Sequence, residues 1–431
     1  MKKFLALFLV LVLVLSMAAC AGNNDTADTS TDDSSTTTEG DKTITIGGLY
    51  PLTGSAANSG KTMQYGIDFA IQRINESGAL GDYTLNVVWG DTQGDAAVSV
   101  TEAERLITEE NVDIIMGCYQ SGVTLTAQAV GEQHGCPFIT ANATSDNLTA
   151  QGYEYFFRLA PTNMMFLRDM VQFCKTYSDD NNLGLKTVAI CVDNTEVGQE
   201  TINYAEYWCE QEGLEIIGTV THPSGASDLS SEVLQLKQLN ADILIADQYV
   251  SDAILLTNTM LEQDYKPGLM IVKANGYTEA DYVASVGNKL NGIMMATEFI
   301  EGSRGQDISD AYKEFSGEAL NGHSAEAFTV VYTIAEAVHN IAERGEEVTR
   351  DTLQQELSQI SIQEKFWDGT EIIMPYDVIE FCEATTVMDM EYLHTNLAGC
   401  LTIAQYQDGV LYAVYPETAA QKDVIYPAPF E

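Results

Sequence analysis

The chain contains few basic residues. Its 431 residues include 20 Lys and Arg against 63 Asp and Glu, which gives a formal net charge of −43. Such a surface repels phosphate backbones and anionic lipid headgroups, so we expect neither nucleic acid nor a lipid surface as a direct partner. An anionic ligand would have to be held locally, by backbone amides and hydroxyl groups, against this overall charge.

Long apolar runs are absent after the first twenty residues, so no later segment is expected to cross a membrane. The chain begins with Met-Lys-Lys, continues with an apolar run at 4–15, and reaches Cys20 through Ser-Met-Ala-Ala. This arrangement resembles a bacterial lipoprotein signal, with Cys20 as the lipidated first residue, and a plain secretory signal is the alternative. We therefore expect a signal peptide at 1–19 and an extracytoplasmic, lipid-anchored protein.

Residues 21–42 lack aromatic and large aliphatic side chains, so 20–42 is expected to be a disordered tether. The seven cysteines that follow Cys20 contain no Cys-x-x-Cys pair, which favours buried free thiols over disulfides. If one bridge exists, Cys382 with Cys400 is the first candidate. The five histidines are isolated in sequence, with no pair at helical i, i+4 spacing, so no metal site is expected.

Catalytic motifs are missing as well. Residues 54–62 follow an expected strand and open an expected helix, as a phosphate-binding loop would, but five residues separate the two glycines where that motif needs four. Ser121 lies outside any Gly-x-Ser-x-Gly elbow. We therefore predict a protein without enzyme activity or cofactor, and keep an exported hydrolase or NTPase as the last alternative.

Strand-like and helix-like patterns alternate in two successive series, which predicts two doubly wound α/β units. The first series ends near residue 159, and the second runs from 186 to 272. A further strand at 293–296 and two long helices follow. The chain is expected to end in a β-hairpin, 401–406 and 410–415, with Asp408-Gly409 as its turn.

Two loops rich in hydroxyl groups, 117–122 and 141–145, follow the expected strands 112–116 and 138–140. In a parallel sheet, loops after neighbouring strands lie at the edge where open α/β folds bind their ligands. Ser121 and Thr144, together with free amides at a helix start, can converge there on a small anion. The alternative is that both residues are ordinary helix N-caps.

Several segments, in order, resemble the leucine/isoleucine/valine-binding protein family of ABC importers. They are Ile-Gly-Gly-Leu-Tyr-Pro-Leu-Thr-Gly (46–54), Gly-Ile-Asp-Phe-Ala-Ile-Gln-Arg-Ile-Asn (66–75), Ile-Met-Gly (115–117), Ile-Thr (139–140) with Asn-Ala-Thr (142–144), Phe-Arg (157–158) and Ala-Gln-Tyr-Gln-Asp-Gly (404–409). The resemblance implies an α/β fold of two doubly wound parallel-sheet lobes joined by a three-stranded hinge, as in type I periplasmic binding proteins. It also implies a monomeric solute-binding protein that serves an ABC permease complex.

The resemblance further implies where the lobes divide. The N-terminal lobe would comprise 43–160 and 292–397, and the C-terminal lobe 161–291 and 398–431. The hinge crossings are expected near 159–162 and 292–297 and within 397–401.

The family's ligand-binding residues match this chain unevenly. Ser121 and Thr144 match the hydroxyls that hold the ligand carboxylate, Asn142 the nearby backbone carbonyl, and Tyr249 and Phe328 two aromatic positions. Three positions depart from the family: Ser59 and Val197 replace aromatic residues, and Asn275 replaces the acid that meets the ligand ammonium. Asp247 could supply that charge instead. Tyr119 could replace part of the apolar surface that the family's aromatic residues provide at the positions of Ser59 and Val197.

These departures leave the solute open. A branched-chain amino acid, an amide, a urea or a carboxylate without an amine all remain candidates. A ligand-sensing ectodomain that reports to a receptor is the alternative to transport, since one fold serves both roles.

Overall fold

The computed structural model describes residues 42–388 and 390–430. The expected signal peptide, Cys20 and the expected tether as far as residue 41 therefore lie outside the described part of the chain, and Lys42, placed in the tether, is instead the first residue of β1. Within that part, no helix is both long and apolar enough to cross a membrane.

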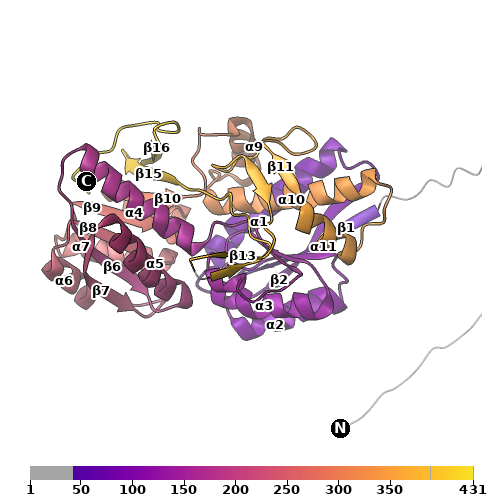
Figure 1. Ribbon diagram of the computed structural model, residues 1–431, viewed down its shortest axis with the longest axis horizontal. Helices are drawn as coiled ribbons and strands as arrows, with labels where there is room; N and C mark the ends of the chain where they lie inside the picture. The colour runs from indigo at the N-terminus through magenta and orange to yellow at the C-terminus, as the bar shows by residue number, and fades with distance from the viewer. Residues whose placement is uncertain (1–41, 389, 431) are drawn as a thin grey trace, which may run out of the picture. The chain divides into compact units, whose positions relative to one another are not determined.

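The first sheet is parallel, with strand order β2-β1-β3-β4-β5. Helices cover both of its faces (Figure 1). Alternate strand residues enter separate cores: Ile114 and Met116 pack with α1 and α10, while Ile115 packs with α2 and α3. A strand buried on both faces has a continuous apolar sequence, as β3 has in Ile-Ile-Met (114–116). The elements of this lobe are β1 (Lys42–Tyr50), α1 (Ala57–Ser77), β2 (Tyr83–Asp91), α2 (Ala96–Thr108), β3 (Ile114–Gly117), α3 (Ser121–His134), β4 (Phe138–Thr140), η1 (Asp146–Leu148), β5 (Phe156–Arg158), α9 (Gln306–Ser316), α10 (Gly322–Glu343) and α11 (Arg350–Gln359).

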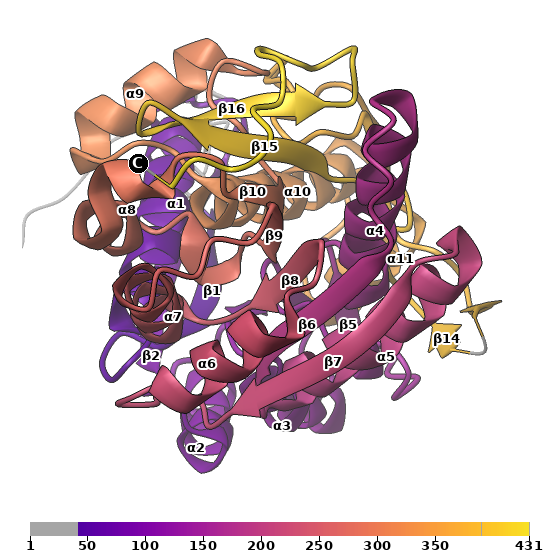
Figure 2. The same ribbon diagram turned by 90° about the vertical axis from the view of Figure 1, so that its left-hand side faces the viewer.

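The second sheet has the order β16-β15-β10-β9-β8-β6-β7, and β15 is antiparallel to both of its neighbours, β10 and β16, while the remaining pairs are parallel. Figure 2 shows α4 and α5 on one face, and α6, α7 and α8 on the other. The elements are α4 (Asn163–Asp180), β6 (Thr187–Asp193), α5 (Glu196–Glu212), β7 (Glu215–His222), α6 (Ser230–Leu239), β8 (Ile243–Asp247), α7 (Val250–Glu262), β9 (Leu269–Lys273), η2 (Asn275–Tyr277), α8 (Ala280–Val286), η3 (Gly287–Leu290), β10 (Met294–Thr297), β15 (Thr402–Gln407) and β16 (Val410–Tyr415).

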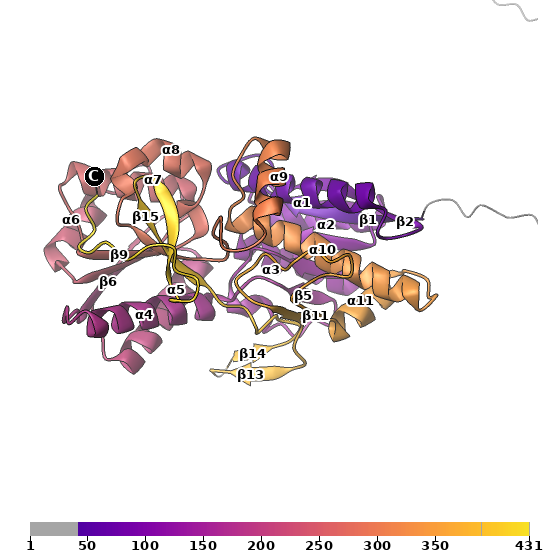
Figure 3. The ribbon, with the colours of Figure 1, turned by 90° about the horizontal axis from the view of Figure 1, so that it is seen from above.

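The expected hairpin is confirmed as β15 and β16. Asp408 and Gly409 both have positive φ, 55° and 77°, as a two-residue hairpin turn with this twist requires. Two further small ribbons, β11 (Ser361–Gln363) with β12 (Val378–Glu380) and β13 (Thr385–Val387) with β14 (Met390–Tyr392), precede it (Figure 3).

The chain passes between the two sheets three times. The first passage joins β5 to α4 at 159–162, as expected. The third lies between Asn396, whose N–H donates to the Arg158 carbonyl oxygen, and Leu401, whose N–H donates to Asp169 of α4.

The second passage corrects the expected lobe boundary. Residues 292–297 were expected in the N-terminal lobe, but β10 pairs with β9 and β15 in the second sheet. The side chains of Met294 and Met295 enter the two cores of that sheet, which fixes the strand there. The chain therefore crosses after Thr297, not before it.

The cysteines among the described residues are all free thiols, as the sequence favours. The suggested bridge between Cys382 and Cys400 is wrong. The Cys400 thiol instead donates a hydrogen bond to the Pro375 carbonyl oxygen, with Sγ and O 3.2 Å apart.

Candidate functional site

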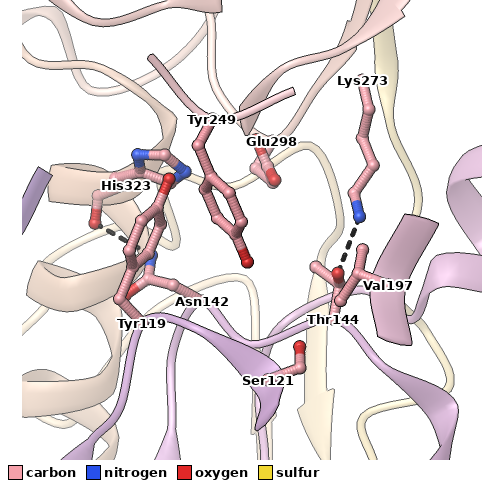
Figure 4. A pocket seen from close by; sticks show the side chains of 9 residues that line it. All are labelled: Tyr119, Ser121, Asn142, Thr144, Val197, Tyr249, Lys273, Glu298 and His323. Atoms are coloured by element: carbon pink, nitrogen blue, oxygen red, sulfur yellow. Dashed lines mark hydrogen bonds between the residues drawn. The ribbon is translucent and has the colours of Figure 1, made fainter. Parts of the chain in front are cut away.

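A polar pocket lies where the carboxyl ends of strands from both sheets meet. The space within it, including its opening to solvent, is about 320 Å³. Figure 4 shows its side chains converging from both lobes. The lining residues are Tyr119, Ser121, Asn142, Thr144, Val197, Tyr249, Lys273, Glu298 and His323.

The pocket brings together six of the ten residues proposed from the sequence. They are Tyr119, Ser121, Asn142, Thr144, Val197 and Tyr249. The loops after β3 and β4 do converge, because the Ser145 N–H donates to Ser121 Oγ at 3.1 Å. This contact follows from the parallel pairing of β3 with β4, which aligns the two strand ends.

Three of the other four proposed residues, Ser59, Asp247 and Phe328, lie elsewhere. Ser59 lines an adjoining outer pocket, which shares Tyr119, Val197 and Tyr249 with the inner one. Asp247 is buried behind the lining. The side chain of Asn275 lies outside the described part of the structure.

Phe328 does not line the pocket. It is fully buried in the first lobe, where its ring stacks on Phe69 and contacts Tyr332. His323, five residues earlier in the same helix, holds the pocket position instead. Five residues turn an α-helix by about 500°, so the two side chains point about 140° apart and cannot share a face.

The Ser121 and Thr144 hydroxyls form the donor side of the pocket. Ser121 Oγ accepts the Ser145 N–H, and Thr144 Oγ1 accepts a hydrogen bond from Lys273 Nζ at 2.8 Å. Because each oxygen already accepts, each hydroxyl can direct its own proton toward a ligand. Ser121 is also the first residue of α3, a helix start without a side-chain cap. This donor set fits a carboxylate or carbonyl oxygen.

Lys273, the last residue of β9, ties this donor side to the second lobe. Its ammonium also donates to Asn163 Oδ1 at 3.0 Å and lies 3.5 Å from Asp247 Oδ2. Asp247 in turn accepts a hydrogen bond from Thr201 at 2.8 Å. Asp247 is therefore paired with Lys273, and it is not itself among the described residues that line the pocket.

His323 and Glu279 form a second buried ion pair, which joins the two lobes. His323 Nδ1 lies 2.7 Å from Glu279 Oε1, and Thr62 of α1 donates to Glu279 Oε2 at 3.1 Å. Burial acts to lower the pKa of His323, but the hydrogen bond and charge of Glu279 outweigh it and raise the pKa above its ordinary value. The pair is thus strongest with a protonated imidazole.

Two further carboxyl groups lie beside this pair. Glu298, directly after β10, is 3% exposed. Burial raises its pKa, against the opposing positive charges of His323 and Lys273. Glu326 accepts a hydrogen bond from Asn142 Nδ2 at 2.7 Å. Burial, and then the charge of Glu298, raises the pKa of Glu326 well above its ordinary value.

Two tyrosines separate the inner from the outer pocket. The rings of Tyr119 and Tyr249 meet edge to face at 5.6 Å, one from each lobe. Tyr119 also contacts the His323 ring at 5.2 Å. Tyr119 and Tyr249 therefore contribute aromatic side chains from both lobes to the boundary between the two pockets.

Sequence reasoning missed Lys273, Glu298 and His323. The rule that selected Ser121 could have found the first two, because each ends or directly follows a strand of the second sheet. His323 had been set aside with the other isolated histidines. Its signal is its place at the start of α10, one residue after the helix begins.

Comparisons with known proteins identify relatives over most of this length. A family model described as "Periplasmic binding protein" matches residues 43–396. A Leu/Ile/Val-binding protein homolog 7 from Brucella suis is 26% identical over 400 residues, covering 89% of this chain and 94% of its own.

Solved structures resemble the fold. LivJ from Streptococcus pneumoniae, a branched-chain amino acid transporter substrate-binding protein in complex with isoleucine, has a TM-score of 0.70 at 19% identity, covering 90% of this chain and 100% of its own. A solute-binding protein of an ABC transporter from Rhodopseudomonas palustris, in complex with 3,4-dihydroxybenzoic acid, has a TM-score of 0.73 at 17% identity, covering 89% and 98%.

Proposed function

The chain belongs to the periplasmic binding protein family, and from this premise we propose that it is the extracytoplasmic solute-binding protein of an ABC importer. Its two lobes would close on a small amino acid-like solute. The observation that carries the proposal is the pocket itself: its polar lining comes from strand ends of both sheets, so a solute bound there would join the lobes.

The donor side of the pocket sets the orientation of the solute. The hydroxyls of Ser121 and Thr144 and the uncapped start of α3 would hold a carboxylate or carbonyl oxygen. Tyr119 and Tyr249 would flank the rest of the solute. A branched-chain amino acid, or a related amide, urea or carboxylate, has a carboxylate or carbonyl oxygen that these donors could bind.

The pocket favours binding over catalysis. A serine nucleophile needs an adjacent general base, but the described partner of Ser121 Oγ is a backbone amide. Among the described lining residues the histidine is His323, and it is bonded to Glu279. These contacts hold groups in place without activating any of them, and we propose a protein without enzyme activity.

We propose rigid-body closure about the three passages between the sheets. Hydrogen bonds such as Thr62 to Glu279 and Lys273 to Thr144 would form only when the lobes meet. The protein would act as a monomer, anchored through Cys20 at the extracytoplasmic face of the membrane, and would deliver its solute to an ABC permease complex.

A thermal-shift screen of the purified protein against amino acids, amides, ureas and short carboxylates tests the proposal. A solute at 100 times its Kd should add about 2.7 kcal/mol to the free energy of unfolding. Small-angle scattering with that solute should show a smaller radius of gyration. A panel without any stabilising compound would refute solute binding of this class.

The alternative is a ligand-sensing ectodomain that reports to a receptor, since the same fold serves both roles. Uptake of the radiolabelled solute by cells with and without the protein separates the two. Importer function requires that uptake fall when the protein is removed, whereas unchanged uptake would favour sensing.

A further inference from the structure

The charged groups around the pocket do not balance. Two cations face it, Lys273 and His323, and each already has an acidic partner. Lys273 lies 3.5 Å from Asp247, and His323 lies 2.7 Å from Glu279. Glu298 also lines the pocket, and its carboxyl group forms no ion pair with another described residue.

The Glu298 carboxyl group is buried, but one of its two oxygens lacks a hydrogen-bond donor. Oε2 has no hydrogen-bond partner among the described residues, although the side chain is 3% exposed. Gly322 makes the room for it, since a Cβ at that position would come within 2.7 Å of Oε2. A buried carboxyl oxygen without a hydrogen-bond donor is unfavourable, so its place in a ligand pocket favours a donor group on the ligand.

Asn142 supplies a second unused acceptor in the same pocket. Its Nδ2 donates to Glu326 Oε2 at 2.7 Å and to the His323 carbonyl oxygen at 3.3 Å, which fixes the orientation of the amide. Oδ1 is buried without a partner among the described residues. In Figure 4 these acceptors lie away from the Ser121 hydroxyl, so the pocket has a donor side and an acceptor side.

We infer that Glu298 is the counter-ion of a protonated amine on the solute, with Asn142 Oδ1 as a second acceptor. The inference rests on the proposed function, in which Ser121 and Thr144 hold the anionic end. The solute is then a zwitterion, an amino carboxylate, and the amine-free carboxylates and ureas are excluded. A carboxylate at Glu298 takes over the role that the family gives to the position of Asn275.

Asp247, which the sequence suggested for this role, is the less suitable acid. Its Oδ2 accepts a hydrogen bond from Thr201 and faces Lys273, and the side chain does not line the pocket.

The two solved structures differ in whether their bound ligand carries an amine. Isoleucine, bound by the Streptococcus pneumoniae protein, carries an amine, whereas 3,4-dihydroxybenzoic acid, bound by the Rhodopseudomonas palustris protein, carries none.

Calorimetric titration with matched pairs tests the inference. The pairs are leucine with 4-methylpentanoate, isoleucine with 3-methylpentanoate, and phenylalanine with 3-phenylpropanoate, and 3,4-dihydroxybenzoate is added alone. The parent protein should bind the amine member of a pair at least about tenfold more tightly, which corresponds to about 1.4 kcal/mol. Glu298→Gln should remove this preference, whereas Asp247→Asn should weaken both members of a pair equally.

The outcomes separate the two proposals. An amine-free member that binds the parent as tightly as its partner, or a Glu298→Gln variant that keeps the preference, overturns the Glu298 assignment and leaves solute binding intact. Failure of every compound to bind the parent overturns the proposed function as well.

The melting temperature of the ligand-free protein distinguishes a ligand-binding role of Glu298 from a structural one. Glu298→Gln replaces an unpaired buried carboxyl group with a neutral amide of the same shape, so the ligand-free variant should melt at the same or a higher temperature than the parent. A lower melting temperature would show that Glu298 supports the fold, and would overturn the assignment.

Discussion

Replacing Ser121 by alanine should cause two separate losses, in affinity and in stability. The side chain is 2% exposed, and Oγ accepts the Ser145 N–H at 3.1 Å. Removing a hydroxyl that donates to a charged ligand group should cost about 1.5–3 kcal/mol of binding free energy, roughly ten- to a hundredfold in Kd. The Ser145 N–H, left buried without its partner, should lower the free energy of unfolding by about 1–3 kcal/mol. The sequence alone indicated the first loss and no change in stability.

Calorimetric titration with the solute found by the screen measures the first loss, and denaturant unfolding without solute measures the second. Ser99→Ala is the matched control. Ser99 is also a buried serine of the first lobe, and its Oγ donates to the Ala96 carbonyl oxygen at 2.8 Å, but it does not line the pocket. It should lose stability and keep the parent affinity. Parent-like binding by Ser121→Ala, or an equal loss of affinity in both variants, would refute the reasoning.

Three further predictions concern other buried groups. Glu279 raises the pKa of His323 above its ordinary 6.5, and would do so only when the lobes are closed. Solute affinity should therefore be highest below pH 6.5 and fall as the pH rises through the raised pKa, and titrations of Glu279→Gln across this range should lack the fall that His323 causes. Burial, with the charge of Asp146, raises the pKa of Glu200 from 4.5 to about 7. The folded state therefore binds this proton more tightly, so stability should fall as the pH rises from about 4.5 to about 7, and denaturant midpoints of Glu200→Gln should lack this slope. Phe328→Ala should lower the free energy of unfolding by about 3–5 kcal/mol, while calorimetry on the folded variant should give the parent affinity, contrary to a ligand role.

The features that depend on local sequence could be predicted. Alternation of apolar strands with amphipathic helices identifies two α/β lobes, because each period reflects which faces of an element are buried. The loops that carry Ser121 and Thr144 were identified for a related reason: in a parallel sheet, the residue after a strand always lies at the ligand-binding edge. The Asp408-Gly409 turn needs two positive φ angles, which these residue types adopt readily.

Features that depend on contacts between distant segments could not be predicted. The strand at 294–297 has an apolar pattern that fits either sheet, and only its pairing with β9 and β15 assigns it to the second. Phe328 matches an aromatic position of the family, yet the phase of α10 turns it into the core and presents His323 to the pocket.

The distribution of charge in the pocket was likewise decided by tertiary structure. Asp247 and Glu298 both follow the sequence rule for a site residue, as acids at the carboxyl ends of strands. The sequence does not say which of them meets a cation, because Lys273 comes from a third strand and its distance to each depends on the packing of the sheet. In the folded protein Lys273 lies 3.5 Å from Asp247, and Glu298 is left with Oε2 unpaired among the described residues. Coulombic energy depends on separation in space, so only the fold determines which acid remains to meet a solute.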